Sequence, residues 1–276
     1  MALPPLRRID SAANPTVKAA RALRDKKHRR ASGAFLAEGL RIATEAREAG
    51  VLPQQLFIGD HADRHPLIDA LIDATLASGG EAIVASRDVL AKLSGKDNPQ
   101  SVVGIYAERA ASLEALDRTA APIWFVAQAM RDPGNLGTLL RTGDAVGAGG
   151  VILVDDCVDP FSVETVRASM GALFTQAIVP SDWLSFLGWL RSGPGQLVGT
   201  SLAPGAVDYR DAPYAAPVFI LVGNEARGLP AEYEDACDVR VTIPMRGRAD
   251  SLNASVAAAV TAYRVADILE RRGVQA

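Results

Sequence analysis

Three segments in the second half of the chain combine glycine, asparagine and charged residues, a composition suited to holding a polar ligand. They are residues 132–137, residues 223–229 and residues 243–253. Polar side chains in such segments can orient a substrate and stabilise charge that develops during a reaction, and glycine lets the backbone approach a ligand closely. The first segment leads into an expected helix that carries Arg141 about two turns in.

Each segment also has a purely structural interpretation. Asp-Pro-Gly-Asn at 132–135 is ordinary turn chemistry, Ser251 can cap a helix, and Gly223 can serve a tight turn. All three histidines lie within the first 65 residues, and the two cysteines, Cys157 and Cys237, stand far apart in the sequence. A histidine base, a metal site or a disulfide framework is therefore not expected in this half of the chain.

Short apolar runs separate these segments and predict the elements that position them. The runs are residues 123–126, 151–154, 197–199 and 218–222. Continuous β-branched runs of this length are typical of strands buried on both faces of a parallel sheet. Helices are expected between them at 136–146, 163–173 and 183–190, with a last, alanine-rich helix over 252–272. Because ligands bind beyond the carboxyl ends of parallel strands, we expect the three segments to form one pocket.

The first half alternates in the same manner and predicts a smaller α/β domain. A basic helix is expected from Asn14-Pro15 through Arg30, because Pro is favoured in the first turn. Further elements are expected as strands at 34–37, 55–58, 83–84 and 102–107 and helices at 38–48 and 67–77. Residues 108–122 are alanine-rich and polar, and fit either a linker or one helix between domains. The domains are predicted as 1–110 and 122–276, joined by a linker over 111–121.

Composition narrows the classes of protein to which the chain can belong. Its 276 residues are 49% hydrophobic and 22% charged, with a net charge of −3. No apolar stretch approaches the ~20 residues of a membrane span. The segment from Met1 to Asp10 lacks the apolar core of a signal peptide, so a cytoplasmic location is expected. Residues 1–30 carry nine Lys and Arg against two Asp, a local charge of +7 that suits either phosphate binding or a solvated helix face.

Taken together, the three segments resemble the motifs of the SpoU (TrmH-like) branch of the SPOUT RNA methyltransferases. The resemblance is carried by residues 131–137 with Arg141 and Thr142, by 221–225 with Gly228, and by 243–245 followed by 251–253. Residues 166–172 are similar to a stretch that the family has between its first two motifs. Residues 36–41 and 97–104 look like its N-terminal substrate-binding domain, which is similar to ribosomal protein L30e.

This resemblance implies a trefoil-knotted α/β methyltransferase domain that works as a homodimer. It also implies that S-adenosylmethionine is held largely by backbone groups in the knot's loops, without a metal. The positions that match the family's cofactor contacts are Gly223, Asn224, Ile243, Met245, Leu252 and Asn253. The implied reaction methylates a ribose 2′-hydroxyl in structured RNA, with ribosomal RNA favoured over transfer RNA by the domain layout.

Arg141 matches the family's catalytic arginine. Since the pKa of arginine lies above ~12, we expect it to stabilise the developing alkoxide and to hold a phosphate with its planar fork, not to act as a free base. Asn135 and Glu225 are expected to orient Arg141 or the ribose, and Ser251 and Asn253 to shape the pocket. For Arg167 three roles remain open, which are contact with RNA phosphate, contact with the methionine carboxylate, or an ion pair between helices.

Two other functions are compatible with parts of the sequence pattern. A nicotinamide-dependent enzyme is disfavoured because the glycine-rich stretch at 147–150 precedes a strand, whereas the dinucleotide fingerprint follows one. A non-catalytic RNA-binding or ribosome-assembly member of the same fold is the alternative. The joint presence of all five candidate side chains favours an enzyme.

Overall fold

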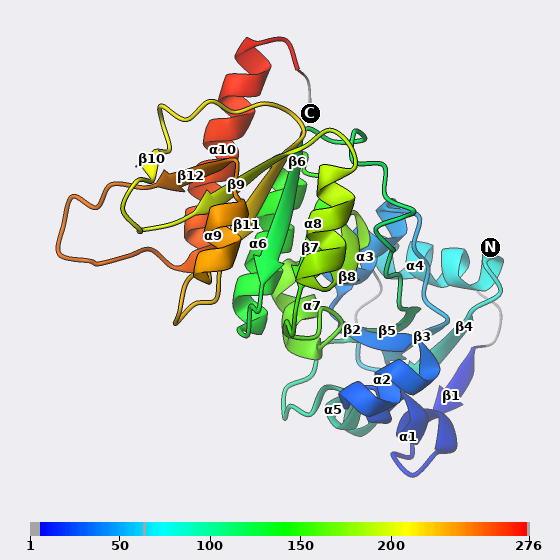
Figure 1. Ribbon diagram of the computed structural model, residues 1–276. Helices are drawn as coiled ribbons and strands as arrows, with labels where there is room; N and C mark the ends of the chain where they lie inside the picture. Colours follow the sequence, from blue (N-terminus) through cyan, green and yellow to red (C-terminus); the bar gives the residue numbers. More distant parts are fainter. Residues whose placement is uncertain (1–5, 63–64, 275–276) are drawn as a thin grey trace. The chain divides into compact units, whose positions relative to one another are not determined.

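The chain forms two compact units in the computed structural model, which describes residues 6–62 and 65–274 (Figure 1). The segment from Met1 to Asp10 was expected not to be a signal peptide, and its first five residues lie outside the described part. One unit consists of Met1–Glu108 together with Phe161–Thr175, and the other of Arg109–Pro160 together with Gln176–Ala276. In the described residues no helix is long and apolar enough to cross a membrane.

The N-terminal unit is built on a five-stranded sheet with the strand order β1-β4-β3-β5-β2, in which β5 runs antiparallel to both of its neighbours. Its strands are β1 (Arg7–Ile9), β2 (Ala34–Glu38), β3 (Gln55–Gly59), β4 (Glu81–Ala85) and β5 (Val102–Ala107). Its helices before residue 108 are α1 (Pro15–Ala22), α2 (Lys26–Ser32), α3 (Leu40–Glu48), α4 (Pro66–Ala77) and α5 (Arg87–Ser94). The alternating α/β prediction is thus confirmed here, with β1 and α5 as additional elements.

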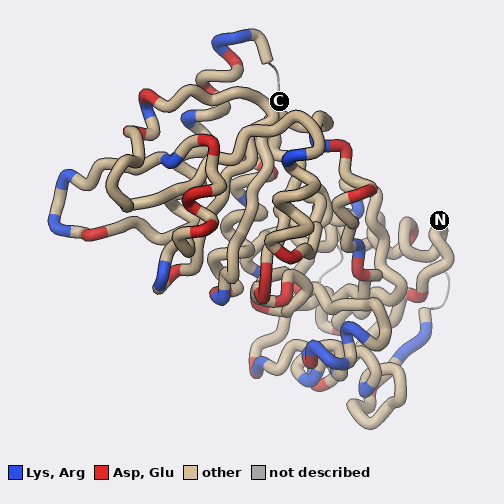
Figure 2. The backbone as a smooth tube through the Cα atoms, in the orientation of Figure 1, with Lys and Arg blue, Asp and Glu red and all other residues tan. Residues whose placement is uncertain are grey.

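The single basic helix expected through Arg30 is wrong, because the chain forms two helices there. α1 ends at Ala22, and Asp25 begins a new helix by accepting a hydrogen bond from the backbone N–H of Lys27 at 2.7 Å. An aspartate in the N-cap position satisfies N–H groups that a continuing helix would bond internally. Lysines and arginines cluster on this part of the tube in Figure 2.

Residues 161–175 leave the C-terminal unit and complete the aromatic core of the N-terminal one. Phe161 lies 5.1 Å from Phe35, and Phe174 lies 4.9 Å from Tyr106, measured between ring centroids. The helix expected over 163–173 is shorter: α7 spans Val163–Ser169 and ends where Met170 adopts a left-handed backbone with φ 54°. A short 3-10 turn, η1 (Ala172–Phe174), follows.

The C-terminal unit is an all-parallel sheet of seven strands in the order β10-β12-β9-β11-β6-β7-β8. The four strands expected from apolar runs are present as β6 (Ile123–Gln128), β7 (Gly150–Val154), β9 (Gln196–Thr200) and β11 (Val218–Val222). Sequence reasoning missed β8 (Ala177–Ser181), β10 (Val207–Asp208) and β12 (Val239–Thr242). The order places β11 between β9 and β6, so the second candidate segment emerges near the centre of the sheet.

Helices cover both faces of this sheet (Figure 1). α6 (Pro133–Ala145) and α10 (Ala254–Arg271) pack together on one face, with α10 against β11 and β6. α8 (Trp183–Arg191) and α9 (Ala231–Ala236) cover the other, where Phe186 and Tyr233 join the core around Trp124 and Phe219. Residues 109–122 contain turns and a single bridge from Ala110 to Ile178, so the alternative of one helix there is wrong.

Replacing either of two glycines of this unit by alanine should change the stability of the fold, in opposite directions. A Cβ at Gly150, where φ is +155°, would lie 2.2 Å from the backbone oxygen of Ala177 in the next strand. Gly150→Ala should therefore lower the free energy of unfolding by about 2–4 kcal/mol. A Cβ at Gly188, in the exposed middle of α8, meets nothing within 4 Å. Gly188→Ala should raise the stability by up to about 1 kcal/mol.

Denaturant unfolding of both variants beside the unmodified protein measures these changes. A Gly150→Ala protein as stable as the Gly188→Ala protein would contradict the close strand packing described here.

Candidate active site

The first candidate segment is the N-terminus of α6, not the loop that the sequence suggested. Asp132 caps the helix by accepting a hydrogen bond from the backbone N–H of Asn135 at 2.7 Å. Pro133 occupies the first helical position, where its missing N–H costs nothing. Asn135 therefore lies in the first turn of α6, and its side chain is about nine-tenths buried.

The carboxylate of Glu225 closes the same helix end from the second segment. It accepts hydrogen bonds from the backbone N–H groups of Arg131 at 3.3 Å and Asp132 at 3.2 Å, and from the side-chain amide of Asn135 at 3.0 Å. Burial tends to raise the pKa of Glu225, but these hydrogen bonds and one from its own backbone N–H outweigh it and lower the pKa. The group is thus held as a carboxylate, which also suits the positive end of the helix dipole.

Asn135 connects this helix end to the third segment. Its side-chain oxygen accepts a hydrogen bond from the side-chain amide of Asn253 at 2.8 Å. The oxygen of Asn253 in turn accepts from the backbone N–H groups of Ser255 at 3.0 Å and Val256 at 3.3 Å. Asn253 is therefore the N-cap of α10, and the alternative that Ser251 caps this helix is wrong.

The second segment is a tight turn whose backbone leaves no room for a side chain at Gly223. A Cβ there would lie 2.4 Å from the backbone carbon of Gly228. Asn224 and Gly228 exchange two backbone hydrogen bonds, of 3.2 and 2.9 Å. The side chain of Asn224 donates to the backbone oxygen of Ala129 at 2.8 Å, which fastens the turn to the end of β6. The turn needs glycine at 223 because backbone passes directly beside it.

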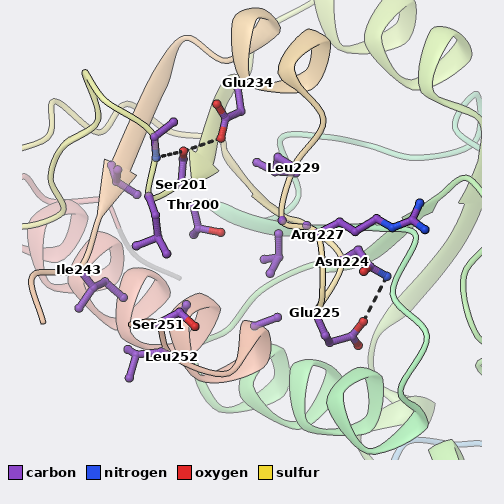
Figure 3. A pocket seen from close by; sticks show the side chains of 18 of the residues that line it. Thr200, Ser201, Asn224, Glu225, Arg227, Leu229, Glu234, Ile243, Ser251 and Leu252 are labelled. Carbon is purple, nitrogen blue, oxygen red and sulfur yellow. Dashed lines mark hydrogen bonds between the residues drawn. The ribbon is translucent and has the colours of Figure 1, made fainter. Parts of the chain in front are cut away.

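A cavity of about 390 Å³ lies between the second segment, the third segment and the chain that follows β9 (Figure 3). The first segment does not line it, so the expectation that all three segments form one pocket is wrong. Of the residues expected to contact the cofactor, five line it and Asn253 does not; the five are Gly223, Asn224, Ile243, Met245 and Leu252. Of the residues expected to act in catalysis, Glu225 and Ser251 line it. Asn135 and Asn253 stand behind this wall through the hydrogen bonds described above.

Arg141 lies apart from this arrangement. It is exposed on α6, six residues after Asn135 and therefore on a different side of the helix. It does not line the cavity, and within residues 6–62 and 65–274 no hydrogen bond or ion pair holds its guanidinium. Arg167 is exposed on α7 of the N-terminal unit, and no ion pair with another described residue forms there either.

The other groups capable of chemistry are not poised as nucleophiles or metal ligands. Burial raises the pKa of Cys157 to about 11 and that of Cys237 to about 12, so neither thiol readily becomes a thiolate. Among the described residues no group of three or more His, Cys, Asp or Glu could hold a metal ion.

Sequence reasoning missed three polar residues that line the cavity, Thr200, Ser201 and Glu234. Ser201 directly follows β9, so the rule that ligands bind at the carboxyl ends of parallel strands would have found it. Glu234 lies on α9, a helix of six residues that is too short to give a clear periodic pattern.

Comparison with known proteins agrees with this geometry. Residues 122–263 match the SpoU rRNA Methylase family, and a relative from Bacillus subtilis, 23S rRNA (guanosine(2553)-2′-O)-methyltransferase RlmP, is 30% identical over 94% of this chain and 99% of its own length. The chain belongs to the SpoU rRNA methylase family. Residues 14–104 match the MRM3-like substrate binding domain, which confirms the expectation of a substrate-binding domain in the first hundred residues.

Solved structures of SpoU relatives share the whole fold. The AdoMet-bound rRNA methyltransferase from Sinorhizobium meliloti is 38% identical, with a TM-score of 0.87 over 98% of this chain and 99% of that one. The SpoU methyltransferase AviRb from Streptomyces viridochromogenes, in complex with AdoMet, is 28% identical, with a TM-score of 0.81 over 94% of this chain and 100% of that one. The expected SPOUT α/β fold is confirmed, and the trefoil knot stays a prediction.

The pKa of Glu225 leads to a prediction about stability and pH. Because the folded-state pKa is below the ordinary value of 4.5, the carboxylate stabilises the fold above pH 4.5 and this contribution is lost as the pH falls through the folded-state pKa. Glu225→Gln should therefore lower the free energy of unfolding at pH 7, by less than about 1 kcal/mol because the group is largely exposed.

Denaturant unfolding at pH 7 and at pH 3 measures this difference, which should shrink at the lower pH. Glu232→Gln, an exposed residue of α9, is the control. A loss on Glu225→Gln that is equal at both pH values would contradict the role of the charge.

Proposed function

We propose that the protein transfers a methyl group from S-adenosylmethionine to a ribose 2′-hydroxyl of ribosomal RNA. The observation that carries this proposal is the cavity between the second and third SpoU segments. The first segment is joined to its wall through the hydrogen bonds of Asn135 with Glu225 and Asn253. Relatives support the reaction: RlmP and 23S rRNA (uridine(2479)-2′-O)-methyltransferase from Streptomyces viridochromogenes, 30% identical over 87% of this chain, are both named as 2′-O-methyltransferases of 23S rRNA.

The cavity fits the methyl donor. Its size lies within the ordinary range for small-molecule sites, roughly 300–1,000 Å³. Gly223 lets the backbone come close to a ligand, and the apolar side chains of Ile243, Met245 and Leu252 suit the flat face of an adenine. When bound, S-adenosylmethionine supplies a methyl group on a positively charged sulfur that departs as a neutral thioether.

In this proposal some residues fix the shape of the cavity, and Arg141 acts on the ribose hydroxyl that receives the methyl group. Asn135, Glu225 and Asn253 keep the wall of the cavity and the start of α6 in a fixed geometry, so the nucleophile meets the methyl group without reorganisation. Arg141 stabilises the developing alkoxide of the ribose and holds an adjacent phosphate with its planar guanidinium, and the proton of the 2′-hydroxyl leaves to that phosphate or to water. The N-terminal unit, with its basic α1 and α2, binds the RNA through phosphate contacts.

We further propose that the enzyme is a homodimer of the cytoplasm. Arg141 is exposed and does not line the cavity of its own chain, so a second copy has room to bring substrate or side chains to it. The last helix exposes apolar residues that a partner would cover, Val256 at 44% and Tyr263 at 57% of their surface. A shallow hollow beside Tyr263, lined also by Tyr209 and Val260, offers a complementary surface.

Replacement of Arg141 tests the catalytic part of the proposal. Arg141→Ala should lower the turnover of rRNA methylation by about 100-fold or more, because alkoxide stabilisation is felt mainly in the transition state. Its affinity for S-adenosylmethionine should stay within a few-fold. Arg141→Lys should restore little activity, since an ammonium has no planar fork.

The assay measures methyl transfer to rRNA and maps the product nucleotide, while calorimetry measures binding of the methyl donor. Near-normal turnover of Arg141→Ala would refute the assigned role. An unmodified protein that binds RNA and S-adenosylmethionine without transferring the methyl group would instead indicate a non-catalytic RNA-binding member of the family.

The dimer is tested by a charge on the exposed face of α10. Tyr263→Glu should convert the dimer into a monomer, because a carboxylate there would be buried against apolar surface without a partner. Leu184→Glu, on α8 with 79% of its surface exposed, is the matched control and should remain dimeric. Light scattering at assay concentration distinguishes the two states, and a monomeric unmodified protein with full activity would refute the proposal.

A further inference from the structure

A hydroxyl and a carboxylate face the cavity from the side that Glu225 does not occupy. The hydroxyl of Ser201 donates a hydrogen bond to Oε1 of Glu234 at 2.5 Å and accepts one from the backbone N–H of Ala203 at 2.9 Å (Figure 3). Both residues line the cavity, and the Ser201 side chain is almost fully buried. The pair therefore offers a hydroxyl and a carboxylate to a ligand on this side of the cavity.

Glu234 is held rigidly because its helix is fastened on two sides. The ring of Tyr233 stacks on Trp183 at 3.9 Å between centroids, and its hydroxyl donates to Asp155 at 2.6 Å. After the helix, Asp238 accepts from the backbone N–H of Leu197 in β9 at 2.7 Å. A short helix fixed in this way presents Glu234 to the cavity in one geometry, as a binding group requires.

The carboxylate is the free acceptor among the charged groups of the cavity. Glu225 uses its oxygens on the start of α6, and the side chain of Arg227 extends away from Ser201 in Figure 3. Oε1 of Glu234 takes one hydrogen bond from Ser201, and Oε2 lies 3.6 Å from the guanidinium of Arg240. An ionised carboxylate has about four acceptor positions, so about two remain for a ligand.

These acceptors match two neighbouring hydroxyl groups better than a cation. Arg240 already offsets the negative charge of Glu234, which weakens its attraction for a positively charged sulfur or an ammonium group. Two adjacent O–H donors, by contrast, can use both remaining acceptor positions at once, and hydrogen bonds from a hydroxyl to a carboxylate are among the stronger ones. In S-adenosylmethionine the group of this kind is the pair of 2′- and 3′-hydroxyls on the adenosyl ribose.

We propose that Ser201 and Glu234 recognise the ribose hydroxyls of the methyl donor, with Glu234 as the acceptor and Ser201 as the residue that positions it. This inference rests on the proposed function, because it assigns S-adenosylmethionine to the cavity. It places the ribose at the β9–α9 wall and leaves the wall formed by Glu225 and Asn224 for the reacting end of the molecule.

Three ligands distinguish the groups that Glu234 could contact. S-adenosylmethionine carries the charged sulfur, the ammonium group and the ribose; S-adenosylhomocysteine lacks the charge on sulfur; and 5′-methylthioadenosine keeps the ribose but lacks the ammonium group. Glu234→Gln preserves the shape of the side chain and removes its charge. It should weaken the binding of all three ligands alike, by about tenfold, as expected for loss of a charge-assisted hydrogen bond.

Removal of a ligand hydroxyl completes a double-mutant cycle. The 2′-deoxy or the 3′-deoxy form of 5′-methylthioadenosine should bind the unmodified protein about tenfold more weakly than the parent compound, and this difference should nearly vanish in Glu234→Gln. Glu232→Gln, on the same helix but exposed and outside the cavity, should bind every ligand as the unmodified protein does. If Glu234→Gln melts at a lower temperature, Ser201→Ala provides the same cycle through the positioning hydroxyl.

Calorimetric titration of the full chain decides between the outcomes. Unchanged affinity in Glu234→Gln, a loss confined to S-adenosylmethionine, or a loss shared by the two larger ligands but absent for 5′-methylthioadenosine would each overturn the assignment to ribose. Failure of the unmodified protein to bind S-adenosylmethionine would instead remove the proposed function itself, and this inference with it.

Discussion

The side-chain amide of Asn135 joins the start of its own helix to two parts of the chain that are 90 and 118 residues away in sequence. Its N–H₂ group donates to Glu225 and its oxygen accepts from Asn253, so both ends of one amide are used at the same time. A carboxylate at this position would face Glu225 with like charge, and an apolar side chain would leave the partner groups without hydrogen bonds in a largely buried place. Together with the hydrogen bonds of Glu225 to the backbone of Arg131 and Asp132, this amide fixes the start of α6, the turn after β11 and the start of α10 relative to one another.

That network explains why the binding wall is well formed while the proposed catalytic side chain stands outside it. Glycine, amide and carboxylate groups in the wall bond mostly to backbone, and backbone geometry is fixed by the parallel strands behind it. Arg141 has no such restraint among the described residues.

In the C-terminal unit, sequence patterns predicted the four strands at the centre of the sheet and missed the three near its edges. β8 contains Pro180 and lies at one edge, where a missing N–H is tolerated; β12 alternates polar and apolar residues near the other edge. Neither shows the continuous apolar run that indicates a central strand. The helix α5 was missed although Ser86 and Gly95 are typical cap residues, so that signal was present in the sequence.

The sequence predicted those parts of the candidate site where a turn or a helix end requires a particular residue type. Gly223 and the asparagines follow from turn and cap preferences together with the family motifs. The sequence could not show whether Ser251 or Asn253 is the N-cap of α10, because both residue types cap helices well. Glu234 could not be found either, because its place in the wall depends on the packing of Tyr233 against Trp183, a contact between elements distant in sequence.

The excursion of residues 161–175 has a consequence for modularity. The chain passes between the two units after residues 108, 160 and 175. The substrate-binding unit is therefore formed by two stretches that are separate in the sequence. Phe161 and Phe174 fill a core whose other rings, Phe35 and Tyr106, come from before residue 108. If residues 1–108 alone were exchanged between relatives at a single fusion point, these two pairs of rings would come from different proteins. The N-terminal unit is therefore made of two separate stretches of the chain, and recombination that moves only the first would leave its aromatic core without Phe161 and Phe174.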